Sequence, residues 1–290
     1  MVELQKKIRA LWNRSHSPAL MPRSRYRVYA INNALGRSST YFNFGFWRDH
    51  PKDADHASEA LAALLGETAS LSTEDQVLDV GFGFADQDIF WCHRFSPKKI
   101  YGIDLCLHQV SKAQNRVRQL GLCDKIIPID GSATQIPFRD NSFDSIMALE
   151  CAFHFNKRDD FFREAFRVLK PGGRLTLTDV IGLEKSLSIG SRLSQWNVRR
   201  MWNIPKYNLY PRNLYVEKLA RAGFCLVEVQ SIFEHVIPPL LEYARGRLKE
   251  KDLTERMDPI VNIEMRIGLW LLKFFKIPSS FDYVLARAVK

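Results

Sequence analysis

The sequence has few cysteines and no long apolar run, and both absences narrow the class of protein. The five cysteines (Cys92, Cys106, Cys123, Cys151 and Cys225) are odd in number, widely spread and never spaced as CxxC. This pattern argues against a disulfide framework and against a zinc site, so we expect buried, reduced thiols. Nowhere do about 18 apolar residues follow one another without a charge. The opening MVELQKKIRALWNRSHSP also lacks the apolar core of a signal peptide. We therefore expect a soluble, cytoplasmic protein.

Acidic residues are scarce relative to basic ones, with 32 Asp and Glu against 42 Lys and Arg and a formal net charge of +10. The imbalance is not uniform, because residues 74–181 hold 14 basic and 15 acidic side chains. The whole basic excess therefore lies in the flanking segments. A nucleic acid, an anionic small substrate or plain solvent could face such flanks, so charge alone leaves the partner open.

Strand-like segments dominate the middle of the chain. VLDVG, KIYGID, KIIPID, SFDSIMAL and RLTLTDVI are short apolar runs separated by stretches long enough for helices. This alternation predicts an α/β fold with a parallel sheet covered on both faces. Two later segments, AGFCLVEVQSI (222–232) and FDYVLARAV (281–289), predict a terminal antiparallel pair at the sheet edge. No internal repeat interrupts this order, and 290 residues suffice for one large domain with additions.

The first strand breaks into a glycine turn in VLDVGFGFADQD. Gly81 and Gly83 permit a tight turn at the strand end, where doubly wound sheets bind their ligands; a turn without a ligand is the alternative. A dinucleotide site would need a third glycine where the chain has Asp86, and acids at this helix start would repel a diphosphate. A turn bordered by Asp79, Asp86 and Asp88 instead suits a cation such as the sulfonium of S-adenosylmethionine.

Four ordered segments resemble one family. These are VLDVGFGFA, GIDLCLHQVSKAQNRV, IDGSATQIPFRDNSFDSIMALE and FREAFRVLKPGGRLTLTDV, and they are similar to the class I S-adenosylmethionine-dependent methyltransferases, in particular their small-molecule, natural-product branch. The resemblance covers residues 60–235. It implies a doubly wound, seven-stranded Rossmann-like sheet, mostly parallel with an antiparallel last strand, to which helical lid and cap segments are added.

The resemblance also implies a set of cofactor-binding residues. Asp104 ends the second strand about 20 residues after the glycines, where a carboxylate can accept both ribose hydroxyls. The full set is Tyr41, Asp79, Gly81, Gly83, Gln87, Asp104, Leu105, Ser132, Ala133 and Glu150. Two positions depart from the family pattern. Ala85 replaces a third glycine, and Ser132 precedes Ala133 where an acid often contacts the adenine amino group. The Ser132 hydroxyl could still accept that hydrogen bond, or Asp130 could take the role instead.

Three residues are candidates for acid–base catalysis by resemblance to O-methyltransferases. His154 follows the fourth strand and could accept a hydroxyl proton as a neutral imidazole; the alternative is a histidine packed between phenylalanines. Asp179 ends the fifth strand and could instead brace the loop that follows. Glu150 could be a base, a positioning group for the acceptor or a partner of His154. No metal is implied.

The domain organisation follows from these segments. Residues 1–73 are expected to be a helical extension and cofactor lid, in which Tyr41 of STYFNFGFWRD closes over the cofactor; the same aromatic run could simply dock helices on the sheet. Residues 74–235 form the core with an inserted cap at 182–221. Residues 236–290 add a helical cap and the last strand to the same domain.

The acceptor is sought in the cap segments. The basic, aromatic segment 199–215 is expected to wall a pocket for a hydrophobic acceptor such as a lipid, isoprenoid, sterol or polyketide, methylated on oxygen or carbon. If the acceptor is an isoprenoid diphosphate, its anchors are Arg199, Arg200 and Arg212. The amphipathic segment 264–278 predicts a cap helix, with peripheral membrane contact as the alternative.

Other functions are less consistent with the sequence. Nucleic-acid methyltransferases carry an (N/D)PP(Y/F) loop or a Pro-Cys nucleophile after the fourth strand, where this chain has LECAFHF. A cyclase or scaffold that binds S-adenosylmethionine without transferring its methyl group is the alternative from another class. A homodimer is compatible with all of these.

Overall fold

The computed structural model describes residues 35–183, 192, 195–196, 199, 202–256, 262–263, 266–267 and 281–290. Its centre is a seven-stranded sheet with strand order β3-β2-β1-β4-β5-β7-β6. The strands are β1 (Gln76–Val80), β2 (Lys99–Asp104), β3 (Ile126–Asp130), β4 (Phe143–Leu149), β5 (Leu169–Ile181), β6 (Cys225–Ser231) and β7 (Asp282–Val289). Strands β1 to β5 pair in parallel, and β7 runs antiparallel between β5 and β6. The predicted fold and the antiparallel edge pair are confirmed.

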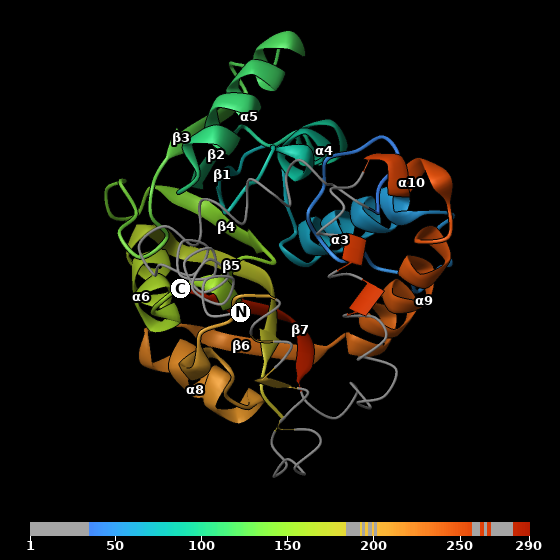
Figure 1. Cartoon of the computed structure of the whole chain (residues 1–290). Helices are drawn as coiled ribbons and strands as arrows, with labels where there is room; N and C mark the ends of the chain where they lie inside the picture. The colour runs from blue at the N-terminus through green and yellow to red at the C-terminus, as the bar shows by residue number, and fades with distance from the viewer. Residues whose placement is uncertain are drawn as a thin grey trace, which may run out of the picture.

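Helices cover both faces of this sheet (Figure 1). One layer contains α3 (Ala54–Thr68), α4 (Asp86–Phe95) and α5 (Leu107–Gln119), and the other contains α6 (Arg158–Val168) and α8 (Arg212–Arg221). Because successive side chains of a strand point to opposite faces of the sheet, neighbouring residues of β1 pack in two different hydrophobic cores. Val77 packs in the core with Leu65 of α3, whereas Leu78 packs in the core with Phe161 of α6.

Five more helical elements have described bounds. They are the 3-10 turns η1 (Ala152–His154), η2 (Lys206–Asn208) and η3 (Phe233–His235) and the helices α9 (Ile237–Arg247) and α10 (Lys251–Arg256). Among the described residues, no helix is both long and apolar enough to cross a membrane. The amphipathic segment 264–278 lies outside the described residues except for 266–267, so its expected helix is not tested there.

The parallel strands β1, β2 and β4 end at one edge of the sheet. Their register places Asp79 beside Gly102 and Asp79 beside Met147. The residues that follow each strand, namely Gly81, Leu105 and Glu150, therefore emerge at the same edge. The site is built from these strand ends.

An amino-terminal strap, residues 37–47, crosses this edge without forming a helix. Here the structure differs from the expected helical extension, because the strap has no helical period and Gly45 has φ of 77°. Asp55 accepts hydrogen bonds from Ser38 N and Ser39 Oγ, and Trp47 N donates to His235 O. Residues 1–34 lie outside the described residues.

The cysteines are all free, but the expectation that all are buried is wrong for two of them. Cys123 is exposed in the turn before β3, and Cys225 is exposed at the start of β6. Cys225 is exposed because β6 is the edge strand and lacks a neighbour on one side. Cys106 and Cys151 are buried, and Cys92 is partly buried.

Candidate active site

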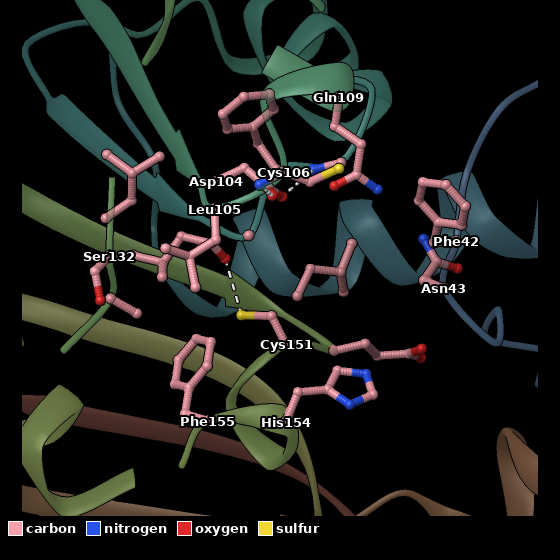
Figure 2. Close-up of a pocket in the computed structure, with 18 of the residues that line it drawn as sticks. Phe42, Asn43, Asp104, Leu105, Cys106, Gln109, Ser132, Cys151, His154 and Phe155 are labelled. Carbon is pink, nitrogen blue, oxygen red and sulfur yellow. Dashed lines mark hydrogen bonds between the residues drawn. The ribbon is translucent and has the colours of Figure 1, made fainter. Parts of the chain in front are cut away.

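A cavity of about 660 Å³ opens at the carboxyl edge of β1, β2 and β4. This volume lies in the usual range for small-molecule sites. Figure 2 shows Asp104, Cys106 and Gln109 together on one side and His154 and Phe155 on another, with Phe42 and Asn43 of the strap on a third. The walls therefore come from segments that are far apart in the sequence, including residues 203–205 and Tyr207 of the predicted cap.

The glycine turn forms as its sequence predicts. Gly81 and Gly83 have φ of 76° and 61°, values that disfavour residues with a Cβ. A Cβ on Gly81 would lie 2.6 Å from the Cβ of Cys151, which packs against the turn and donates through Sγ to Val80 O. Ala85, at the position where the family usually has glycine, also adopts a left-handed φ of 64°. Both glycines line the cavity.

Asp104 is held at the cavity wall by three donors. Cys106 N donates to Oδ1 at 2.8 Å and Gly83 N to Oδ2 at 3.3 Å. The Gln109 side-chain amide, turned with its nitrogen toward the carboxylate, donates to both oxygens at 3.0 and 3.2 Å. Burial raises the pKa of Asp104 to about 6, so the group is largely ionised at neutral pH. No sequence pattern pointed to Gln109, which reaches Asp104 only because it lies in the first turn of α5.

Asp79 and Asp88 do not border the cavity as the sequence suggested. Both are fully buried beneath the glycine turn and are absent from the cavity wall. Burial, and for Asp88 also the nearby Asp79, raises the pKa of Asp79 to about 7 and that of Asp88 well above its usual range. The pair therefore keeps a proton near neutral pH. Asp79 acts on the cavity through Gln87, whose amide donates to its Oδ2 at 2.9 Å.

Asp86 lines the cavity but is paired with a cation. Its Oδ2 lies 2.8 Å from Arg116 Nη1. It also accepts hydrogen bonds from the backbone and hydroxyl of Thr40 in the strap. Together with Asp79 and Asp88, this pairing corrects the electrostatic argument from the sequence: these three acids stabilise the turn and the strap and do not present three free negative charges to a sulfonium.

The remaining predicted cofactor residues lie around the same end of the cavity. Leu105, Ser132 and Ala133 line it beside Asp104. The Ser132 hydroxyl lies 3.1 Å from Thr134 Oγ1 within its own turn. Tyr41 of the strap also lines the cavity, and its hydroxyl donates to Asp86 O at 3.3 Å.

Glu150 lines the cavity and has an uncommon backbone conformation, with φ of 54°. Its backbone N donates to Thr178 Oγ1 at 3.2 Å. Its Oε1 accepts from Phe44 N at 2.9 Å and from the Tyr283 hydroxyl at 2.6 Å. Burial outweighs both hydrogen bonds and raises the pKa of Glu150 to about 8.

His154 is the last residue of η1, four residues after Glu150 in the sequence, and it also lines the cavity. Burial lowers the pKa of the His154 imidazole to about 4, and hydrogen bonds with the backbone of Asn203 and Trp202 offset only part of this effect. Its ring lies 4.2 Å from that of Phe153. His154 is therefore a neutral imidazole at physiological pH.

Asp179 does not line the cavity and is fully buried. Arg158 Nε lies 3.1 Å from its Oδ2, and the Tyr215 hydroxyl donates to the same oxygen at 2.8 Å. Arg158 also donates to Asn208 O and Val180 O, both at 3.1 Å. Burial raises the pKa of Asp179, and Arg158 counters the rise. This geometry favours the bracing role over the acid–base role for Asp179.

Replacing Arg158 tests the bracing role. Arg158→Met leaves the Asp179 carboxylate buried without its cation, and we expect a loss of about 3–5 kcal/mol in unfolding free energy, measured by urea denaturation. Arg163→Met, on the same helix but in an exposed pair with Asp160, is the control and should change stability little. Equal, small effects of the two substitutions would contradict a structural role for the buried pair.

The residues at the Asp104 end fit the expected cofactor. A strand-end carboxylate can accept ribose hydroxyls, the small residues Gly83 and Ala133 leave room beside it, and Ile103 and Leu105 supply apolar surface for a base. Asp104 and Gln87 add polar side chains to the cavity wall. The donor set is therefore consistent with S-adenosylmethionine.

Comparisons with known proteins agree with this site. Residues 78–177 match the family model described as methyltransferase domain. Over 286 residues, the chain is 34% identical to erythromycin 3''-O-methyltransferase of Saccharopolyspora erythraea, covering 97% of this chain and 93% of that relative.

Solved structures share the fold. A cyclopropane synthase from Mycobacterium tuberculosis has a TM-score of 0.75 at 18% identity, covering 91% of this chain and 95% of its own. The geranyl diphosphate C-methyltransferase from Streptomyces coelicolor, solved with S-adenosyl-L-homocysteine, has a TM-score of 0.70 at 17% identity, covering 94% and 98%. Together with the full-length relative, these matches lead to one assignment: the chain belongs to the class I S-adenosylmethionine-dependent methyltransferases.

Proposed function

We propose that the protein methylates a hydroxyl oxygen of a neutral, largely apolar small molecule. The observation that carries this proposal is the composition of the cavity wall. Among the described residues that line it there is no lysine or arginine, whereas Asp86, Asp104 and Glu150 are acidic. Among these described lining residues an anionic acceptor would find no charge partner, and burying an unpaired charge is costly.

The acceptor is expected at the end of the cavity away from Asp104. Phe155, Ile204 and Pro205 provide apolar surface there, and Asn203 and Tyr207 provide uncharged hydrogen-bonding groups. Such a wall suits a molecule with an apolar body and several neutral oxygens. Tyr207 is 60% exposed, which places it at the mouth, where a large acceptor would protrude.

The arginines predicted to bind a diphosphate do not support that alternative. Arg212 Nη2 lies 3.1 Å from Asp282 Oδ2. Arg199 Nε donates to Ile204 O at 3.4 Å, and Arg200 lies outside the described residues. An isoprenoid diphosphate is therefore the second candidate. The relative that acts at the 3'' oxygen of erythromycin adds support for oxygen methylation.

Glu150 is the proposed general base. When bound, S-adenosylmethionine supplies a methyl group activated by its sulfonium. The acceptor oxygen forms the new C–O bond, the electron pair of the broken S–C bond stays on sulfur, and the hydroxyl proton passes to the Glu150 carboxylate. A carboxylate with a pKa of about 8 is a stronger base than an imidazole with a pKa of about 4 and is better matched to neutral pH. The neutral His154 is proposed to orient the acceptor.

A panel of acceptors tests the proposed substrate class. The purified protein is incubated with S-adenosylmethionine and either 3''-O-demethylated erythromycin, as a hydroxyl acceptor without an anionic group, or geranyl diphosphate. S-adenosylhomocysteine formation is then measured. We expect turnover with the demethylated erythromycin and none above background with the diphosphate. The reverse result would overturn the neutral-acceptor proposal and favour the isoprenoid alternative.

A further inference from the structure

Tyr283 lies in β7, 133 residues after Glu150, and its side chain is fully buried. In the sheet it is opposite Val180 of β5. Its hydroxyl donates to Glu150 Oε1 at 2.6 Å, which is a short, strong hydrogen bond to a carboxylate. Its ring lies 6.1 Å from that of Phe44 in the strap. Tyr283 therefore contacts both the acid and the segment that covers it.

The contacts of Glu150 leave one oxygen for chemistry. Oε1 accepts from Tyr283 and from Phe44 N. Among the described residues, no hydrogen bond is made to Oε2, although the side chain lines the cavity. The backbone is held as well, because Glu150 N donates to Thr178 Oγ1. A carboxylate fixed through one oxygen presents the other in a defined direction.

We propose that Tyr283 is a positioning residue, which holds Glu150 so that Oε2 meets the acceptor hydroxyl. The proposal rests on the proposed function of Glu150 as the base. It gives β7 a role in the reaction, since this strand supplies the only described side chain that hydrogen-bonds to the Glu150 carboxylate. Because Phe44 N shares Oε1, the base reaches this arrangement when the strap is seated over the cavity.

Other titratable groups face Glu150 across the cavity. They are Tyr41 from the strap, Asp86 from α4, Asp104 from β2, Cys106, Cys151, His154 from η1 and Tyr207 from η2. None of them hydrogen-bonds to the Glu150 carboxylate in the described residues, and the hydrogen bonds that lower its pKa come from Tyr283 and Phe44. Removing the Tyr283 hydroxyl should therefore raise the pKa of Glu150.

The matched pair of variants is Tyr283→Phe and Tyr215→Phe. Both tyrosines are fully buried, and each donates to a carboxylate, but Tyr215 serves Asp179, which does not line the cavity. Infrared difference spectra of the protein alone, recorded against pH, follow the carbonyl stretch of protonated Glu150; the band lost in Glu150→Gln identifies it. We expect Tyr283→Phe to move its midpoint up by about one to two pH units and Tyr215→Phe to leave it unchanged.

Kinetics complete the test. With an active acceptor, Tyr283→Phe should lower kcat at pH 7 by about tenfold or more, because the ionised fraction of Glu150 falls by that factor, while KM for S-adenosylmethionine stays unchanged. Raising the pH should restore part of the rate. Tyr215→Phe should keep the wild-type pH profile.

The two proposals fail in different ways. An unchanged infrared midpoint in Tyr283→Phe would overturn the positioning role, whatever the activity. A shifted midpoint together with full activity of Glu150→Gln would overturn the base role of Glu150 and keep the contact. Thermal unfolding of both tyrosine variants verifies that they fold.

Discussion

Asp104→Ala is expected to weaken S-adenosylmethionine binding by at least about 100-fold. The substitution removes the carboxylate that is expected to accept from both ribose hydroxyls. Each such hydrogen bond to a charged acceptor contributes about 1.5–3 kcal/mol, and about 1.4 kcal/mol corresponds to a tenfold change in affinity. The donors that hold Asp104, namely Gly83 N, Cys106 N and the Gln109 amide, would also lose their partner. Isothermal titration calorimetry measures the affinity directly.

Asp124→Ala is the control for this prediction. Asp124 is exposed in the turn before β3 and does not line the cavity, so its removal changes the net charge equally without touching the site. It should bind the cofactor as the wild type does. If Asp104→Ala retains wild-type affinity, the cofactor does not bind at the end of β2.

Glu150→Gln is expected to lower kcat by about 10²–10⁴-fold, the usual contribution of a general base. Glutamine keeps the size of the side chain and can still accept from Phe44 N and Tyr283, but it cannot accept the hydroxyl proton. Affinity for S-adenosylmethionine should stay unchanged. Because the base works only when ionised, wild-type kcat/KM should rise with pH through about 8, and the variant should lack this rise.

His154→Gln separates the two candidate bases. As an orienting group, His154 is expected to affect the KM of the acceptor more than kcat, and the rise of the wild-type profile near pH 8 should persist in the variant. If His154→Gln lowers kcat and removes the rise near pH 8 while Glu150→Gln keeps the wild-type kcat, then His154 is the base and Glu150 is not.

The strand pattern and the glycine turn could be predicted because their determinants are local. Apolar runs of four to eight residues between helical stretches define the parallel sheet, and topology then brings the ends of β1 and β2 together. Asp104 could be identified by its position alone, since a residue that ends the strand next to β1 lies at the cavity edge. The antiparallel pair of β6 and β7 followed from the same reasoning.

Side-chain burial could not be predicted from these patterns. Asp79, Asp86 and Asp88 form one acidic cluster in the sequence and all three are buried, yet only Asp86 lines the cavity, where it pairs with Arg116. Which of them faces the ligand depends on the rotation of α4 against β1. Asp179 was predicted to end the fifth strand, but β5 continues to Ile181 and the Asp179 side chain pairs with Arg158.

Long-range contacts were also beyond sequence reasoning. Tyr283 reaches Glu150 across 133 residues, and the contact depends on the register of β7 against β5. The strap was expected to be part of a helical extension over residues 1–73; instead its backbone donors bind carboxylates of the core, such as Glu150 through Phe44 N.

Locating the transferred methyl group tests most directly whether the protein methylates a hydroxyl oxygen with Glu150 as the base. The protein is incubated with S-adenosylmethionine labelled with ¹³C in its methyl group and with a neutral, hydroxyl-bearing acceptor, and the product is examined by NMR correlation spectroscopy. The account predicts a labelled methyl on oxygen, formed by the wild type and lost in Glu150→Gln. A label bonded to carbon, or formed equally well without Glu150, would contradict it.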